Sequence, residues 1–118
     1  MELIMNKYTE MSDFEINKKV ASHYLPCDYN LNKHAKTVEL ISFLGDTDEY
    51  FAYACFDPCN NPADAMPIIN EYGISLIYQD RRFQFATNDG NIECCIANPL
   101  KAAMIILLCM KDAENEKV

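Results

Sequence analysis

The first helical pattern in the chain follows residues 12–15, which read Ser-Asp-Phe-Glu. Ile16, Val20 and Tyr24 come next at intervals of four and therefore share one face of a helix. Because Asn17–Lys19 lie between these positions, we expect their polar side chains to point mostly elsewhere. A serine followed three residues later by a glutamate is typical of a capping box, so the sequence predicts that the helix begins there.

The second helix has two possible starting points. With Asn61 as the N-cap, Pro62 takes the first helical position, where proline fits well, but Pro67 falls inside the helix and must kink it. With Asp64 as the N-cap, Pro67 falls in the first turn, where no amide hydrogen is needed. The second register carries less strain, and a short turn over residues 61–64 that leads into the main helix would satisfy both.

Local signals also define the end of the second helix and the start of the last one. Gly73 is a natural stop, because glycine readily adopts the left-handed conformation that ends many helices. Asn98 and Pro99 supply an N-cap and a first helical residue for the last helix. That helix is apolar almost all round from Leu100 to Met110, which predicts burial in the core or in a dimer interface.

Runs of β-branched, aromatic and other apolar residues predict the strands. Thr37–Leu44 is the first, and Tyr50–Phe56 is apolar on both faces, which predicts a central strand. Pro26 ends the first helix because the residue before a proline disfavours helix, and residues 26–36 are polar and predicted to form a loop. Three short strands are expected over residues 74–78, 83–85 and 92–96, with a hairpin turn at Asn88–Gly90.

The order of these elements predicts the fold class. Hairpins dominate, and strands do not alternate regularly with helices, which favours an α+β fold. We expect a mainly antiparallel sheet of about five strands with three helices packed on it. At 118 residues the chain suits a single domain that spans residues 1–118.

The net charge and the length of the apolar runs exclude some classes of function. The formal net charge is −8 and basic residues never occur in runs longer than two, so we expect no direct binding to DNA or RNA. The longest apolar run, Ala102–Met110, has nine residues, whereas a bilayer-spanning helix needs about 20. Since the N-terminal residues do not resemble a secretory signal, we expect a cytoplasmic protein with reduced thiols and no membrane association.

The densest cluster of turn and cap residues lies between Phe56 and Pro67. Here an apolar strand runs into three prolines, two asparagines and two aspartates. Turns and helix caps account for most of them, but the loop supplies more polar groups than capping requires. That surplus indicates a binding surface or a buried polar network. The candidate binding residues are Asp57, Cys59, Asn60, Asn61 and Asp64.

Asp57 and Asp64 also raise the alternative of a metal site. Carboxylates are preferred ligands of Mg²⁺, and paired carboxylates hold the metal in many nucleases. In the structural interpretation, Asp57 stabilises a turn before Pro58 and Asp64 caps a helix. We favour the structural interpretation, because no third ligand can be placed from the sequence and no lysine lies near either aspartate. We therefore assign no catalytic residue and no metal.

The cysteines raise a second metal alternative. The groups considered for a zinc site are Cys27, Cys55, Cys59, Cys94, Cys95 and His23. Neighbouring side chains along a strand point to opposite faces, so at most one of Cys94 and Cys95 could join such a site. Cys55 and Cys109 lie in apolar segments and are interpreted as small hydrophobic residues. Nothing in the sequence orients Cys27 with His34 as a catalytic pair, and we expect free thiols.

Four blocks of the chain resemble one known family. They are residues 11–18, 57–65, 67–69 and 98–105. In this order they are similar to the NinX proteins of lambda-like bacteriophages and prophages, with Met66 standing where the family pattern has tryptophan. The segment 77–97 is also shorter than in that pattern. The resemblance implies a phage or prophage origin, action in the bacterial cytoplasm and a gene neighbourhood of replication and recombination functions. It implies no activity and no catalytic residues.

These expectations together describe a non-enzymatic interaction module that uses no cofactor and binds an unidentified phage or host protein. A homodimer formed through the last helix or through an edge strand is compatible with the sequence. The alternative is a small metal-dependent enzyme that acts on nucleic acid, with Asp57 and Asp64 at its centre.

Overall fold

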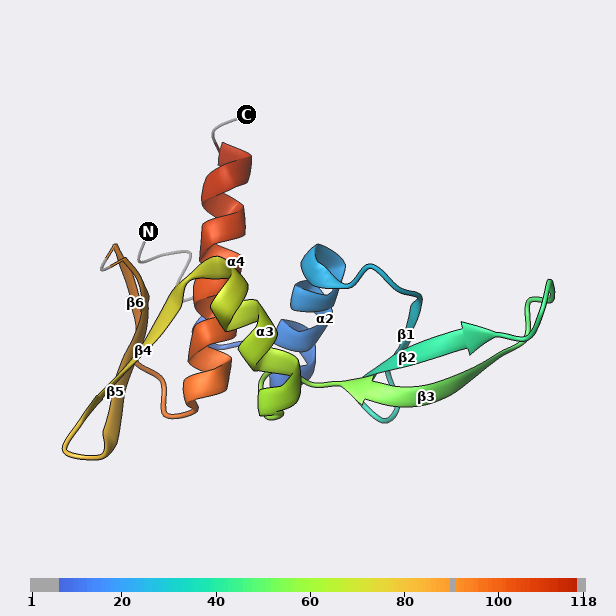
Figure 1. The fold of residues 1–118 in the computed structure, drawn as a ribbon, viewed down its shortest axis with the longest axis horizontal. Coiled ribbons are helices and arrows are strands. Elements are labelled where there is room, and N and C mark those ends of the chain that lie inside the picture. The colour runs from blue at the N-terminus through green and yellow to red at the C-terminus, as the bar shows by residue number, and fades with distance from the viewer. Residues whose placement is uncertain (1–6, 90, 117–118) are drawn as a thin grey trace.

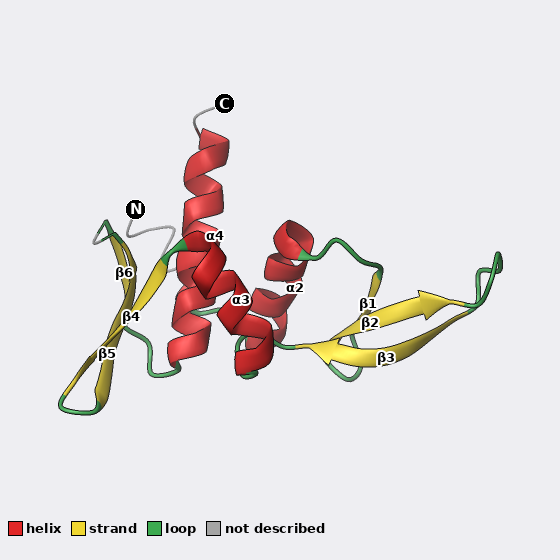
Figure 2. Ribbon diagram, viewed as in Figure 1, coloured by secondary structure: helices red, strands yellow, loops and turns green. Residues whose placement is uncertain are grey.

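Helices α2 (Asp13–Tyr24), α3 (Pro62–Tyr72) and α4 (Pro99–Glu116) lie at the centre of the molecule, between two antiparallel sheets (Figures 1 and 2). The computed structural model describes residues 7–89 and 91–116. The first sheet has the strand order β1-β2-β3, formed by Tyr29–Asn32, Thr37–Phe43 and Tyr50–Phe56. The second has the order β4-β5-β6, formed by Ile74–Gln79, Arg82–Asn88 and Ile92–Cys94.

The predicted α+β class and antiparallel hairpins are confirmed, but the strands form two three-stranded sheets instead of one sheet. The prediction of a loop over residues 26–36 is wrong, because β1 lies there and pairs with β2. Asn30 and Asn32 on β1 donate hydrogen bonds to the Glu39 carboxylate on β2, at 3.1 and 3.0 Å. Tyr29 and Leu31 alternate with these asparagines and pack against the core, but the alternation spans only four residues within a polar segment.

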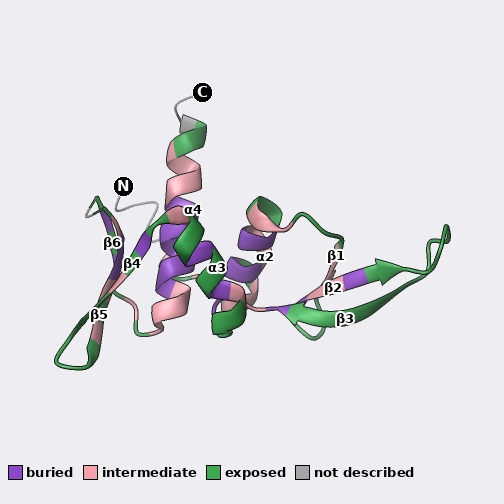
Figure 3. Ribbon diagram, viewed as in Figure 1, coloured by how far each residue is buried: buried purple, intermediate pink, exposed green. Residues whose placement is uncertain are grey.

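The prediction of a central position for Tyr50–Phe56 is also wrong. This segment is β3, an edge strand, and every residue of it except Phe56 is exposed. The β2–β3 hairpin projects away from the helices, so most of its apolar side chains lie beyond the elements that could cover them (Figures 1 and 3). Cys55 is therefore exposed, and its interpretation as a small buried hydrophobic residue is corrected.

The predicted helix ends are confirmed at three places. The Ser12 hydroxyl accepts a hydrogen bond from the Glu15 amide at 3.2 Å and caps α2. Gly73 ends α3 in the left-handed conformation, with a φ of 65°. Helix α4 begins at Pro99, and the Asn98 side chain accepts hydrogen bonds from amides of its first turn. Local capping chemistry therefore sets these boundaries.

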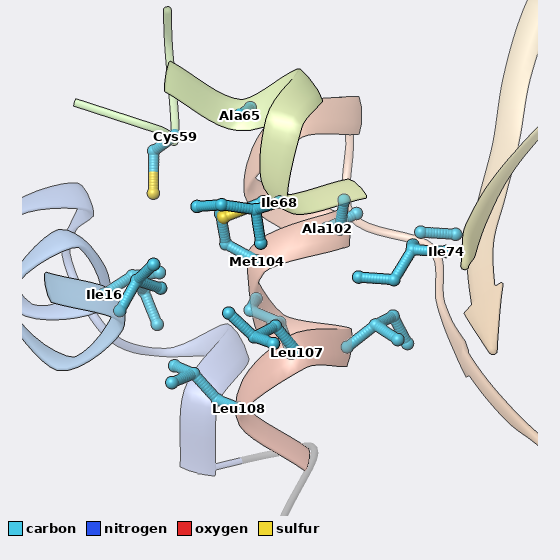
Figure 4. Close-up of a cluster of buried hydrophobic side chains, with 14 of the residues drawn as sticks. Ile16, Cys59, Ala65, Ile68, Ile74, Ala102, Met104, Leu107 and Leu108 are labelled. Atoms are coloured by element: carbon cyan, nitrogen blue, oxygen red, sulfur yellow. The ribbon is translucent and has the colours of Figure 1, made fainter. Parts of the chain in front are cut away.

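The core is built around α4, whose residues from Ala102 to Cys109 are at most 1% exposed. Helix α4 packs against α2, α3 and the β4–β6 sheet, so several of its faces are covered. Ile16, Ile68 and Ile74 bring apolar side chains to it from α2, α3 and β4 (Figure 4). The continuous apolar surface of this helix is thus confirmed as burial in the core.

Two sequence predictions concern residues outside the part that the structure describes. The predicted turn at Asn88–Gly90 includes Gly90, and the N-terminal segment that does not resemble a secretory signal includes residues 1–6. Both Gly90 and residues 1–6 lie outside the described residues. Within the described residues, no helix combines the length and the hydropathy needed to cross a bilayer.

Candidate functional site

The candidate loop forms a corner between β3 and α3. We call residues 57–61 the corner loop; it starts one residue after β3 and ends at the N-cap of α3. Hydrogen bonds join it to Asp13 and Asn17 of α2 and to Asn98 at the start of α4. The N-terminal turns of three helices therefore meet at this loop. Helix N-termini favour nearby negative charge, which suits the carboxylates of Asp13, Asp57 and Asp64.

Asn17 fixes the start of the corner loop. Its side-chain amide donates to the Asp57 carboxylate at 2.7 Å, and its carbonyl oxygen accepts from the Cys59 backbone amide at 3.1 Å. Asn17 is 6% exposed, so both hydrogen bonds are largely shielded from water. The expectation that residues 17–19 point mostly away from the buried face is wrong for Asn17. A buried amide with both ends paired stabilises the loop and satisfies its own polar groups.

Asp64 holds the other end of the loop, and it is not the N-cap of α3. Its carboxylate accepts a hydrogen bond from the Asp57 backbone amide at 2.8 Å and one from the Asn61 side chain at 3.3 Å. Asn61 is the N-cap, because its side chain accepts from the Ala63 amide at 3.0 Å. Of the two registers, the structure therefore has the one that begins at Asn61, and Pro67 lies inside the helix.

The position of Pro67 has a simple physical explanation. Proline has no amide hydrogen to donate to the carbonyl four residues earlier, here that of Ala63. Both residues are exposed, so water can reach the carbonyl that loses its helical partner. The strain that argued against this register is therefore small, and the carboxylate of Asp64 is left free to bind the corner loop.

Asn60 and Asn98 connect the corner loop to α4. Asn98 donates to the Cys59 carbonyl at 2.7 Å, and its own carbonyl oxygen caps α4. Asn60 donates to the carboxylate of Asp13 at 3.0 Å. Lys101 then bridges α4 and α2, with its ammonium 3.0 Å from the same carboxylate. We call these linked polar side chains the corner network; it consists of Asp13, Asn17, Asp57, Asn60, Asn61, Asp64, Asn98 and Lys101.

The corner network makes a pH-dependent contribution to stability. Hydrogen bonding from Asn60 and then the Lys101 ammonium hold the pKa of Asp13 below its ordinary value. Since the folded pKa is lower than the unfolded one, the stabilisation is present above about pH 4 and is lost as the pH falls through the folded pKa. Thermal melting between about pH 6 and pH 3 should show a falling midpoint, and Asp13→Asn should reduce that slope. Equal slopes for the two proteins would contradict this role.

The cysteines do not gather into one site. Within the described residues, no group of three or more His, Cys, Asp or Glu side chains is placed to hold a metal ion. Cys94, the last residue of β6, is buried, and Cys95, which follows the strand, is exposed. Cys59, the cysteine of the corner loop, is fully buried, and burial raises the pKa of its thiol to about 12. Its contribution is packing, because a protonated buried thiol is a poor nucleophile.

Thiol reactivity should follow this burial pattern. The exposed thiols are Cys27, Cys55 and Cys95, and the buried ones are Cys59, Cys94 and Cys109. Titration of the native chain with a chromogenic disulfide reagent is expected to count three reactive thiols, and six after denaturation. Cys55→Ser should remove one of the fast thiols. Fast reaction of Cys59 in the native protein would show that the corner loop opens easily.

A small pocket lies beside the corner loop, on the side of α2 and the first sheet. Its volume is about 190 Å³. The lining includes Asp13, Phe14, Asn17, Val38, Phe56 and Asp57. Asp13, Asn17 and Asp57 are already bound within the corner network, whereas Lys36 and Thr37, which also line the pocket, lie outside it. The structure thus brings all five sequence-predicted site residues together, but it uses their polar groups internally.

Four members of the corner network are not among the candidate residues predicted from the sequence; they are Asp13, Asn17, Asn98 and Lys101. Asp13, Asn17 and Asn98 lie 38 to 47 positions away in sequence from the loop residues that they bind. Lys101 joins the network through Asp13. One signal for Asn17 does exist, because it lies three residues before the buried Val20 and so falls on the same side of α2. A polar residue next to the apolar stripe indicates a buried partner.

Fold and corner network together define a small α+β protein in which polar side chains join three helix N-termini and a hairpin extends beyond the core. A family model described as "Bacteriophage P22, NinX" matches residues 7–111. The chain therefore belongs to the NinX family of phage proteins, and the resemblance seen in the sequence is confirmed. No curated protein and no solved structure was found to match the chain.

Proposed function

We propose that this NinX-family protein is a phage accessory protein that acts in the host cytoplasm as a non-enzymatic interaction module. One observation carries the proposal, which is the apolar surface of the β2–β3 hairpin. Five large side chains with exposed fractions of 44 to 56% lie along it, on both faces of the hairpin. We call them the hairpin patch; they are Phe43, Leu44, Tyr50, Phe51 and Tyr53. Large apolar patches on a protein surface are typical of interaction sites.

The corner loop supports the proposal in a different way. Its candidate groups are occupied by one another, so they offer few free donors or acceptors to a ligand. The loop instead fixes where β3 leaves the helical core and therefore where the hairpin points (Figure 1). In this proposal the corner network is a support for the binding surface.

The test compares two exposed tyrosines. Tyr53 on β3 and Tyr78 on β4 are 56% and 54% exposed, and each lies on a strand. The tagged protein is used to capture partners from an infected or lysogenic host lysate, beside Tyr53→Ser and Tyr78→Ser variants. We expect a partner that Tyr78→Ser retains and Tyr53→Ser loses, because only Tyr53 belongs to the hairpin patch. The proposal fails if nothing is enriched over an unrelated acidic protein, or if both variants retain the partner equally.

A further inference from the structure

We infer that the hairpin patch binds an extended, arginine-containing segment of a partner protein along the edge of β3; this inference rests on the proposed function. The charge of the hairpin is the first observation. Residues 37–56, which form the hairpin, include four acidic residues and no lysine or arginine. The four are Glu39, Asp46, Asp48 and Glu49. Their charge amounts to half of the net charge of −8, so the hairpin is complementary to a positively charged partner.

The acidic residues lie next to the exposed aromatic rings. Asp46, Asp48 and Glu49 belong to the exposed connection between β2 and β3, directly before Tyr50 and Phe51. An arginine side chain suits this surface better than a lysine, because its planar guanidinium stacks on an aromatic ring while it binds a carboxylate. Exposed rings beside carboxylates therefore favour arginine in the partner.

The unpaired edge of β3 indicates that the partner segment binds in an extended conformation. In the first sheet β3 has β2 on one side only, and Tyr50–Phe56 contains no charged residue and no proline. Natural edge strands usually carry such residues, which prevent pairing with another chain. An extended segment could add to this edge through backbone hydrogen bonds, and its alternate side chains would then face the hairpin patch.

A register shift in the hairpin leaves one exposed side chain of β3 without a cross-strand partner. The pairing shifts between Leu40 and Ile41, which oppose Ala54 and Ala52, and this leaves Tyr53 without a partner on β2. Bulged positions of this kind often re-aim a side chain. Tyr53 is also the most exposed large hydrophobic residue among those described. Its ring is therefore available for a partner at the centre of the patch.

A second copy of the chain fits this surface less well. Pairing of two β3 edges would bring two hairpins together, each with four acidic residues and no basic one. Like charges that face each other across an interface oppose association. The charge pattern therefore favours a basic partner over self-association.

The experiment uses a synthetic peptide of about eight residues in which arginine alternates with valine, with blocked ends. The peptide carries a fluorescent label, and the full chain is titrated into it while the fluorescence anisotropy of the label is measured. A labelled glutamate–valine peptide of the same length is measured in the same way. We expect micromolar binding of the arginine peptide only. Its dissociation constant should rise about tenfold when NaCl is raised from about 50 to about 500 mM.

Two charge-matched variants locate the binding surface. The first carries Asp46→Asn, Asp48→Asn and Glu49→Gln at the hairpin tip. The second carries Glu71→Gln, Asp80→Asn and Glu93→Gln, three exposed acids outside the hairpin. The inference predicts that the first variant weakens binding about tenfold and the second less than about twofold. Circular dichroism confirms that both variants remain folded.

Several results would overturn the inference. They are equal weakening by the two variants, equal binding of the glutamate peptide, and no binding of the arginine peptide up to about 1 mM. A dimer in sedimentation that Tyr53→Lys dissociates would assign the patch to a second copy. Loss of the captured partner in Tyr53→Ser without binding of the arginine peptide would leave the interaction module standing and refute only the basic partner. Retention of the partner in Tyr53→Ser would refute the interaction proposal itself.

Discussion

Asn17→Ala is expected to lower the free energy of unfolding by about 2–4 kcal/mol. The substitution removes the donor to the Asp57 carboxylate and the acceptor for the Cys59 amide, both in a largely buried place. Each lost partner leaves a polar group that water reaches poorly, and one of these groups is charged. Since a domain of this size is stable by about 5–15 kcal/mol, the loss is a large share of the total.

The control is Asn70→Ala, an exposed asparagine on α3 for which a change within about 0.5 kcal/mol is expected. Chemical denaturation of the wild type and both variants supplies the comparison. If Asn17→Ala lowers the free energy of unfolding no more than Asn70→Ala does, the corner network does not stabilise the fold. The candidate loop would then be free to serve as a ligand site.

Leu107→Ala is expected to have the largest effect of a single substitution, about 3–5 kcal/mol. Leu107 is fully buried in the middle of α4, where helices and the second sheet meet (Figure 4). Truncation removes apolar contacts and leaves a cavity that the surrounding elements cannot fully close. The matched control is Leu44→Ala, because Leu44 is 47% exposed in the hairpin patch and should cost less than about 0.5 kcal/mol.

The leucine pair also tests the separation of core and binding surface. A small stability loss for Leu44→Ala together with weaker partner capture would assign Leu44 to binding. Similar stability losses for the two leucines would instead mean that the hairpin packs on the core in solution. That result would remove the basis for the interaction proposal.

Local chemistry accounts for the parts of the fold that the sequence predicts correctly. The start of α2, the end of α3 and the start of α4 depend on a serine, a glycine and an asparagine that act within a few residues of their own position. The burial of α4 follows from its apolar surface alone, since a helix that is apolar all round must be covered. Such features need no knowledge of distant contacts.

The incorrect predictions concern features that depend on contacts between residues distant in sequence. Tyr50–Phe56 is apolar on both faces, yet its exposure depends on where the helices lie, and they do not cover it. The start of α3 depends on Asp64 binding the Asp57 amide seven residues earlier, which makes Asn61 the cap. The site residues of the corner loop are predicted from composition, but their role depends on Asn17, which α2 supplies.

Chemical-shift mapping of the full chain with the arginine–valine peptide locates the binding surface most directly. If the hairpin binds and the corner network only supports it, the largest amide shifts should fall in residues 43–53. The amides of residues 57–64 should change little, because their hydrogen bonds are already made within the chain. Shifts concentrated in residues 57–64, or an unchanged spectrum at saturating peptide, would contradict the assignment of the binding surface to the hairpin.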